Sequence, residues 1–188
     1  MPTEYRRPNI LLIMTDQHNA RCTGYEGHPT VRTPNLDRLA ESGVRFNSAF
    51  CNNPICSPSR VCFVTGQYPR THRIVGNDNF EMDDRNPNTL GAQLRRYGYE
   101  TALVGKGHMI GNWDAEAFDH RRYCDLCDAD RANPLTNHYF QYLAERGLAD
   151  KYEDGTLPED HPCRRNWYAT AELPYEHTNE AWTGRESR

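Results

Sequence analysis

Valine, isoleucine and methionine occur throughout residues 1–110 and are absent from residues 111–188. Buried strands are built largely from β-branched aliphatic side chains, so the first part of the chain can supply a parallel sheet. The second part holds all three tryptophans and many charged residues, and we expect helices and loops there at most. The composition therefore predicts two regions. Residues 1–111 belong to an α/β domain, and residues 112–188 form a polar insertion and the start of a truncated helix of the same domain.

The residue patterns alternate between strand and helix in the first region. The predicted strands are residues 9–15, which are apolar throughout, residues 44–50, which alternate, and residues 99–105. The predicted helices are residues 33–43, 60–66 and 89–97, with weaker patterns over 137–146 and 180–188. This order predicts a mostly parallel sheet flanked by helices, followed by an irregular, helical and loop-rich part.

Charge and hydropathy exclude several classes of partner. The 22 Lys and Arg residues against 26 Asp and Glu residues give a net charge of −4, without the basic patch that nucleic acid requires. The longest aliphatic run, residues 10–14, is far shorter than the roughly 20 residues of a membrane span. No signal peptide is recognised, so we expect a cytoplasmic protein, and seven cysteines argue against a disulfide framework.

Polar residues follow two of the predicted strands. Asp16 and Gln17 come after the first strand, and Lys106 and His108 come after the third. Ligands of open α/β sheets bind beyond the carboxyl ends of strands. A carboxylate beside an amide suits a hard divalent cation, and the lysine with the histidine suits an oxyanion. On these residues alone, a turn-capping Asp16 and solvated Lys106 and His108 remain the alternative.

The segment Cys56-Ser-Pro-Ser-Arg60, followed by Thr65-Gly66, resembles the signature of the sulfatase family. Three further features occur in the family's order: the opening strand at residues 7–13, Thr-Pro-Asn-Leu-Asp at 33–37 and Gly-Lys-Gly-His at 105–108. The resemblance covers residues 7–111 firmly and implies an alkaline-phosphatase-like α/β fold. It also implies a hydrolase that acts on a small sulfate ester.

The resemblance implies a role for each site residue. Cys56 would be converted to formylglycine by a maturation enzyme, and the hydrated aldehyde would provide the nucleophile. Arg60 would hold this nucleophile and the metal, while Lys106 and His108 would contact the transferred anion and the leaving oxygen. The alternative for Cys56 is a buried structural thiol, which the surrounding polar turn disfavours. Asn77 is a candidate substrate contact, with a simple turn residue as its alternative.

The resemblance places a divalent cation on Asp16, Gln17 and residue 56, with Ca²⁺ preferred to Mg²⁺ or Mn²⁺. Many family members carry two consecutive aspartates where this chain has Asp16-Gln17. A similar pair occurs in relatives that hydrolyse phosphonate or phosphate esters and in some true sulfatases. The predicted function is therefore sulfate ester hydrolysis, with a phosphonate monoester or phosphodiester hydrolase as the alternative.

Two features of the second region leave further alternatives open. The family's remaining metal ligands have no equivalent, because Asp119-His120 and Asp160-His161 lack a buried strand before them. We therefore expect the N-terminal part of a sulfatase that carries the nucleophile half of the site, or an inactive truncated fragment. Two pairs of residues could form a zinc site, with free thiols as the simpler interpretation: Cys124 with Cys127, and His161 with Cys163.

Overall fold

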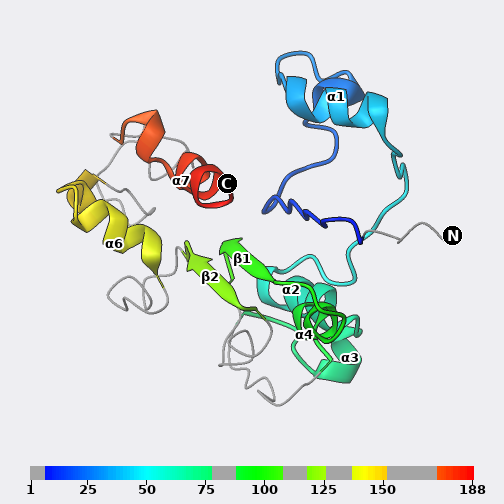
Figure 1. The fold of residues 1–188 in the computed structure, drawn as a ribbon. Helices are drawn as coiled ribbons and strands as arrows, with labels where there is room; N and C mark the ends of the chain where they lie inside the picture. Colours follow the sequence, from blue (N-terminus) through cyan, green and yellow to red (C-terminus); the bar gives the residue numbers. More distant parts are fainter. Residues whose placement is uncertain (1–6, 78–87, 108–117, 126–136, 152–172) are drawn as a thin grey trace, which may run out of the picture. The chain divides into compact units, whose positions relative to one another are not determined.

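The computed structural model describes residues 7–77, 88–107, 118–125, 137–151 and 173–188. They fall into two compact units, Met1–Phe50 and Cys51–Arg188. Figure 1 shows their helices and strands. The domain boundary predicted at residue 111 lies outside the described residues.

The first unit contains the short helix η1 (Gly24–Glu26) and helix α1 (Pro34–Ser42). Pro34 occupies the first turn of α1, where its missing N–H removes no helical hydrogen bond. The Thr33 hydroxyl donates to Asp37 Oδ1 at 2.8 Å and accepts from the Gly24 N–H at 2.8 Å. Asp37 Oδ1 also accepts from the Tyr25 N–H at 2.9 Å. The Thr33–Asp37 motif therefore begins the predicted helix and ties it to η1.

The strands predicted at residues 9–15 and 44–50 are wrong for the described structure, where neither segment is a strand. Their apolar side chains are exposed to solvent. The exposed fraction is 79% for Leu11 and 81% for Phe46. A strand needs a hydrogen-bonded neighbour, and the described part of this unit supplies none to either segment. An apolar run indicates a need for burial, but it does not specify the partner that provides it.

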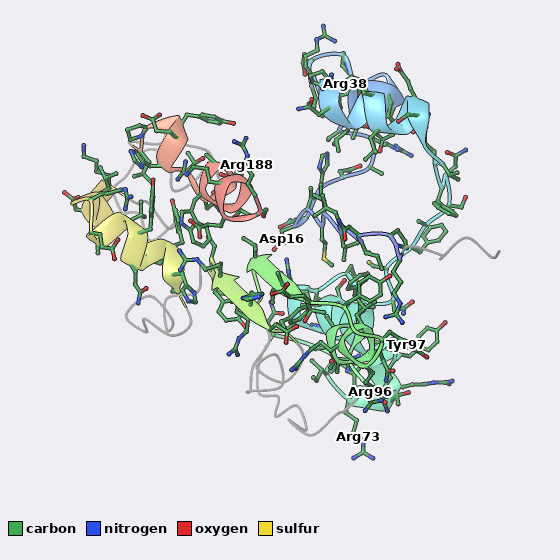
Figure 2. All side chains as sticks on the ribbon, in the orientation of Figure 1. Asp16, Arg38, Arg73, Arg96, Tyr97 and Arg188 are labelled. Carbon is green, nitrogen blue, oxygen red and sulfur yellow. The ribbon has the colours of Figure 1, made fainter. Side chains whose placement is uncertain are left out.

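The second unit begins with three helices, α2 (Cys56–Thr65), α3 (Pro69–His72) and α4 (Leu90–Arg96). Helix α2 starts four residues earlier than the predicted helix at 60–66, because Pro58 is tolerated in the first turn. The helix ends at Gly66, whose left-handed φ of 66° brings its N–H to the Cys62 carbonyl at 2.9 Å. The helix predicted at 89–97 is confirmed as α4. Figure 2 shows Arg96 and Tyr97 pointing outward at its end.

Strand β1 (Ala102–Gly105) pairs in parallel with β2 (His120–Tyr123), so that Gly105 lies opposite Tyr123. The two arrows run side by side in Figure 1. Strand β2 corrects the expectation that residues 112–188 form no strand. Its sequence, His-Arg-Arg-Tyr, has poor strand propensity, so its pairing with β1 overrides the local preference.

Asp119 helps to hold the start of this strand pair. Its Oδ2 atom accepts from the Thr101 N–H at 2.9 Å, and its Oδ1 atom pairs with Arg95 Nε at 2.9 Å. Asp119 and His120 therefore lie at the amino end of β2, whereas ligands of a parallel sheet gather at the carboxyl end. The expectation that the family's remaining metal ligands have no equivalent in this chain stays a prediction.

The remaining elements are α6 (His138–Ala144), η3 (Ala149–Lys151), η4 (Tyr175–His177) and α7 (Asn179–Glu186). Helices α6 and α7 confirm the helices predicted at residues 137–146 and 180–188. The side chains of Asn137 and Thr178 cap their amino ends. The buried core beside these helices consists of Cys124, Tyr139, Leu143 and Trp182. Aromatic rings thus fill the core of a region without Val, Ile or Met. No helix within the described ranges has the length and apolarity needed to cross a membrane.

Candidate active site

Cys56 is the first residue of α2 and is half-buried. The amino end of this ten-residue helix carries a partial positive charge, which favours an anion bound beside Cys56. The opposite side of α2 is anchored by side chains that are shielded from solvent. These are Ser57, Pro58, Val61, Cys62 and Val64. The helix therefore holds residue 56 on a rigid support, with its side chain at the edge of the packed interior.

Asn77 is brought directly to the start of α2. Its Oδ1 atom accepts a hydrogen bond from the backbone N–H of Ser57 at 3.0 Å, across 20 residues of sequence. This contact satisfies one of the N–H groups that the first turn of a helix leaves unpaired. The structure thus places Asn77 beside the candidate nucleophile, and its contact with substrate stays a prediction.

Arg60 and Lys106 are also brought together. Arg60 lies one turn after Cys56, and its Nη1 atom donates to the backbone carbonyl oxygen of Lys106 at 2.6 Å. This bond joins two motifs that are 46 residues apart in sequence. Lys106 follows the carboxyl end of β1, as predicted, so the strand end and the amino end of α2 lie in one site.

Gly105 allows this strand end to pack closely against α7. Its backbone has a left-handed φ of 103°, and a Cβ atom there would lie 3.3 Å from Cγ2 of Thr183. A larger side chain at position 105 would strain the backbone and push against α7. The glycine of the Gly-Lys-Gly-His motif therefore sets the direction in which the chain leaves β1 toward Lys106.

The predicted metal ligands Asp16 and Gln17 lie in the first unit, where Figure 2 labels Asp16. Gln17 has a left-handed φ of 50°, a conformation that is rare for residues other than glycine and is enriched at functional sites. Carboxylate and amide oxygens suit a hard divalent cation. Within the described ranges, no three His, Cys, Asp or Glu side chains gather as a metal-binding group. The assignment of Asp16, Gln17 and residue 56 to a cation stays a prediction.

Other predicted residues lie outside the described residues. His108 is one of them, as are Cys127, His161 and Cys163 of the suggested zinc site. The fourth residue of that site, Cys124, is buried in the core, and burial raises the pKa of its thiol to about 12. Cys124 is therefore a protonated core residue at neutral pH.

A contact between Cys62 and His72 was not predicted from the sequence. Nδ1 of His72 accepts from the Ile74 N–H at 3.1 Å, so the neutral ring carries its proton on Nε2, which lies 3.3 Å from Cys62 Sγ. Burial lowers the pKa of His72 and raises the pKa of Cys62, which keeps both groups neutral. This neutral pair braces α2 against α3. A cysteine and a histidine ten residues apart are too common to indicate such a contact.

Comparisons with known proteins identify the family of this chain. The model of the Sulfatase family matches residues 8–172. The N-acetylglucosamine-6-O-sulfatase of Bacteroides thetaiotaomicron is 36% identical over 117 residues, which cover 62% of this chain and 20% of that protein. The chain belongs to the sulfatase family.

Two solved structures share the fold. One was determined in complex with its substrate D-glucosamine-2-N,6-O-disulfate; it is 34% identical with a TM-score of 0.57, covering 62% of this chain and 23% of that one. The other is phosphonate monoester hydrolase of Agrobacterium radiobacter, which is 25% identical with a TM-score of 0.68. The match covers 96% of this chain and 37% of that one. The matched regions span 18% to 31% of the length of the curated sulfatases. The α/β, alkaline-phosphatase-like fold predicted from the sequence is confirmed.

Proposed function

We propose that this chain carries the nucleophile part of a formylglycine-dependent sulfate ester hydrolase. The observation that supports it most is the 2.6 Å hydrogen bond from Arg60 to the Lys106 carbonyl. It joins the Cys56–Arg60 motif to the strand end that bears the anion-binding lysine. A helix amino end, a guanidinium and an ammonium group are suited to an ester that carries negative charge.

Each residue has a defined task in this proposal. Formylglycine at position 56 would supply, in its hydrated form, one hydroxyl to attack sulfur and a second to release the sulfate. Arg60 orients residue 56 and keeps the Lys106 segment next to it. Lys106 balances the charge of the transferred group, and His108 delivers a proton to the departing alcohol oxygen. Asp16 and Gln17 would hold a divalent cation, Ca²⁺ by preference, which supplies further positive charge.

One observation favours a second candidate, a phosphonate monoester or phosphodiester hydrolase. The phosphonate monoester hydrolase of Agrobacterium radiobacter is similar over 96% of this chain. The Asp16-Gln17 pair is compatible with this class as well as with sulfatases. The same residues would then act on phosphorus in place of sulfur.

A paired assay tests both candidates. The whole protein is produced with a formylglycine-generating enzyme and assayed with Ca²⁺ on an aryl sulfate, an aryl phosphonate monoester and a phosphodiester. We expect the highest kcat/KM on the sulfate, complete loss in Cys56→Ala, and unchanged rates in Cys51→Ala, which changes an exposed cysteine. Preference for the phosphorus esters would establish the second candidate, and hydrolysis of none of them would overturn both.

A further inference from the structure

Asp125 is a buried carboxylate next to the anion-binding segment. It lies two residues beyond Tyr123, which is paired with Gly105, and it keeps only 8% of its surface exposed. A Cβ atom on Gly107 would lie 3.3 Å from Asp125 Oδ2 and 3.1 Å from Tyr123 Cε1. The Asp125 side chain therefore packs against the residue between Lys106 and His108.

The backbone around Asp125 is firmly held. Its carbonyl oxygen accepts a hydrogen bond from the fully buried side chain of Asn137. The N–H of the preceding residue, Cys124, donates to the Gly105 carbonyl at 3.0 Å, which extends the pairing of β1 with β2. These hydrogen bonds fix the backbone of Asp125, so its side chain is held in place beside Gly107.

We propose that Asp125 is a positioning residue that fixes the Lys106–Gly107 segment from the side of β2. Arg60 holds the same segment from the side of α2, through the Lys106 carbonyl. Together the two contacts restrict the backbone from which the Lys106 side chain leaves. The inference rests on the proposed function, since it assigns the segment to anion binding.

The direction of the change in sulfate affinity distinguishes a positioning role of Asp125 from a direct electrostatic effect of its charge. Removal of a negative charge beside an anion site strengthens anion binding, because it relieves Coulomb repulsion. Loss of position weakens binding and slows turnover, because a misplacement of about 1 Å can cost about a hundredfold in rate. The two effects therefore move the affinity for inorganic sulfate in opposite directions.

The test compares Asp125→Ala and the isosteric Asp125→Asn with a matched control, Asp150→Asn, at an exposed aspartate of η3. In the whole matured protein we expect kcat of Asp125→Ala to fall about a hundredfold. The kcat of Asp125→Asn should fall less, and the kcat of the control should equal that of wild type. Thermal unfolding identifies variants that fail to fold, in which case Asp125→Asn decides. An unchanged kcat in a folded variant would overturn the inference.

A calorimetric titration with inorganic sulfate is independent of turnover. We expect weaker sulfate binding in Asp125→Ala by about tenfold; equal or tighter binding would overturn the positioning role. If the wild-type protein hydrolyses no ester, the proposed function fails alone, and this titration still decides the role of Asp125. Gly107→Ala and its combination with Asp125→Ala should be non-additive, because both changes act on one contact.

Discussion

The carboxamide oxygen of Asn77 and the backbone N–H of Ser57 form a hydrogen bond of 3.0 Å at the start of α2. The bond places an exposed polar side chain next to Cys56, and it also caps the helix that presents Cys56. Two explanations of Asn77 follow from this contact, a substrate contact and a purely structural cap. They predict different results for two substitutions.

Asn77→Ala should lower the free energy of unfolding by about 1 kcal/mol, the usual cost of losing a helix cap. Asn77→Asp keeps an oxygen that can accept from Ser57, so stability should be retained. If the amide touches the substrate, both variants should reduce kcat/KM by about tenfold or more. Alanine removes a hydrogen bond to the substrate, and aspartate adds negative charge beside an anion. Chemical denaturation and steady-state kinetics measure the two effects separately. Full activity in a stable Asn77→Asp variant would leave only the capping role.

Cys56 should be the one modified cysteine when the protein is produced with a maturation enzyme. Mass spectrometry of its tryptic peptide should show the thiol replaced by an aldehyde oxygen, while Cys51, Cys62 and Cys124 remain thiols. Burial raises the pKa of Cys62 and of Cys124, so these two should also resist alkylation in the folded protein. An unmodified Cys56 in active protein would contradict the assignment.

Cys56→Ser tests why the residue must be oxidised. Serine has one hydroxyl, so it can accept the transferred group but has no second hydroxyl to expel it. We expect substrate binding within a fewfold of wild type and at most one turnover per molecule, measured as product released against enzyme concentration. Sustained turnover by this variant would exclude the diol mechanism.

The predicted cation site should respond oppositely to two changes of charge. Asp16→Asn removes its anionic ligand and should weaken Ca²⁺ binding by about tenfold or more, whereas Gln17→Glu adds a carboxylate and should preserve or strengthen it. Titration calorimetry of the whole protein with Ca²⁺ provides the comparison. Equal Ca²⁺ affinity in Asp16→Asn and wild type would remove Asp16 from the site.

Acid should destabilise the second unit through His138. Its Nδ1 atom accepts from the Tyr123 N–H at 3.0 Å, which needs a neutral ring. Burial, and after it the charges of Arg122 and Arg121, lower the pKa of His138. A lowered pKa stabilises the fold above the unfolded value of about 6.5, and this contribution is lost as the pH falls through the folded value. Thermal unfolding between pH 7.5 and pH 5 should therefore show a smaller decrease in His138→Asn than in wild type.

Local patterns predicted several elements well because their causes lie within a few residues. Pro34 and the Thr33–Asp37 contacts begin α1, and the side chain of Thr89 caps α4, so these helices need no distant partner. The pattern at residues 60–66 predicted only the later part of α2. The Cys56–Arg60 segment, expected to be a polar turn, forms the first part of that helix, with Pro58 in its first turn. His-Arg-Arg-Tyr offered no strand signal, since β2 exists through its pairing with β1.

The sequence by itself determined the family, the candidate nucleophile and the strand that precedes Lys106, because a contiguous motif and short-range patterns encode them. Tertiary structure alone decided that Asn77 reaches Ser57, that Arg60 holds the Lys106 carbonyl and that Asp125 packs against Gly107. It also decided that residues 9–15 and 44–50 are not strands in the described structure. The reason is physical: a hydrogen bond across 20 or 46 residues, or a strand, exists only when the fold brings its second partner into place.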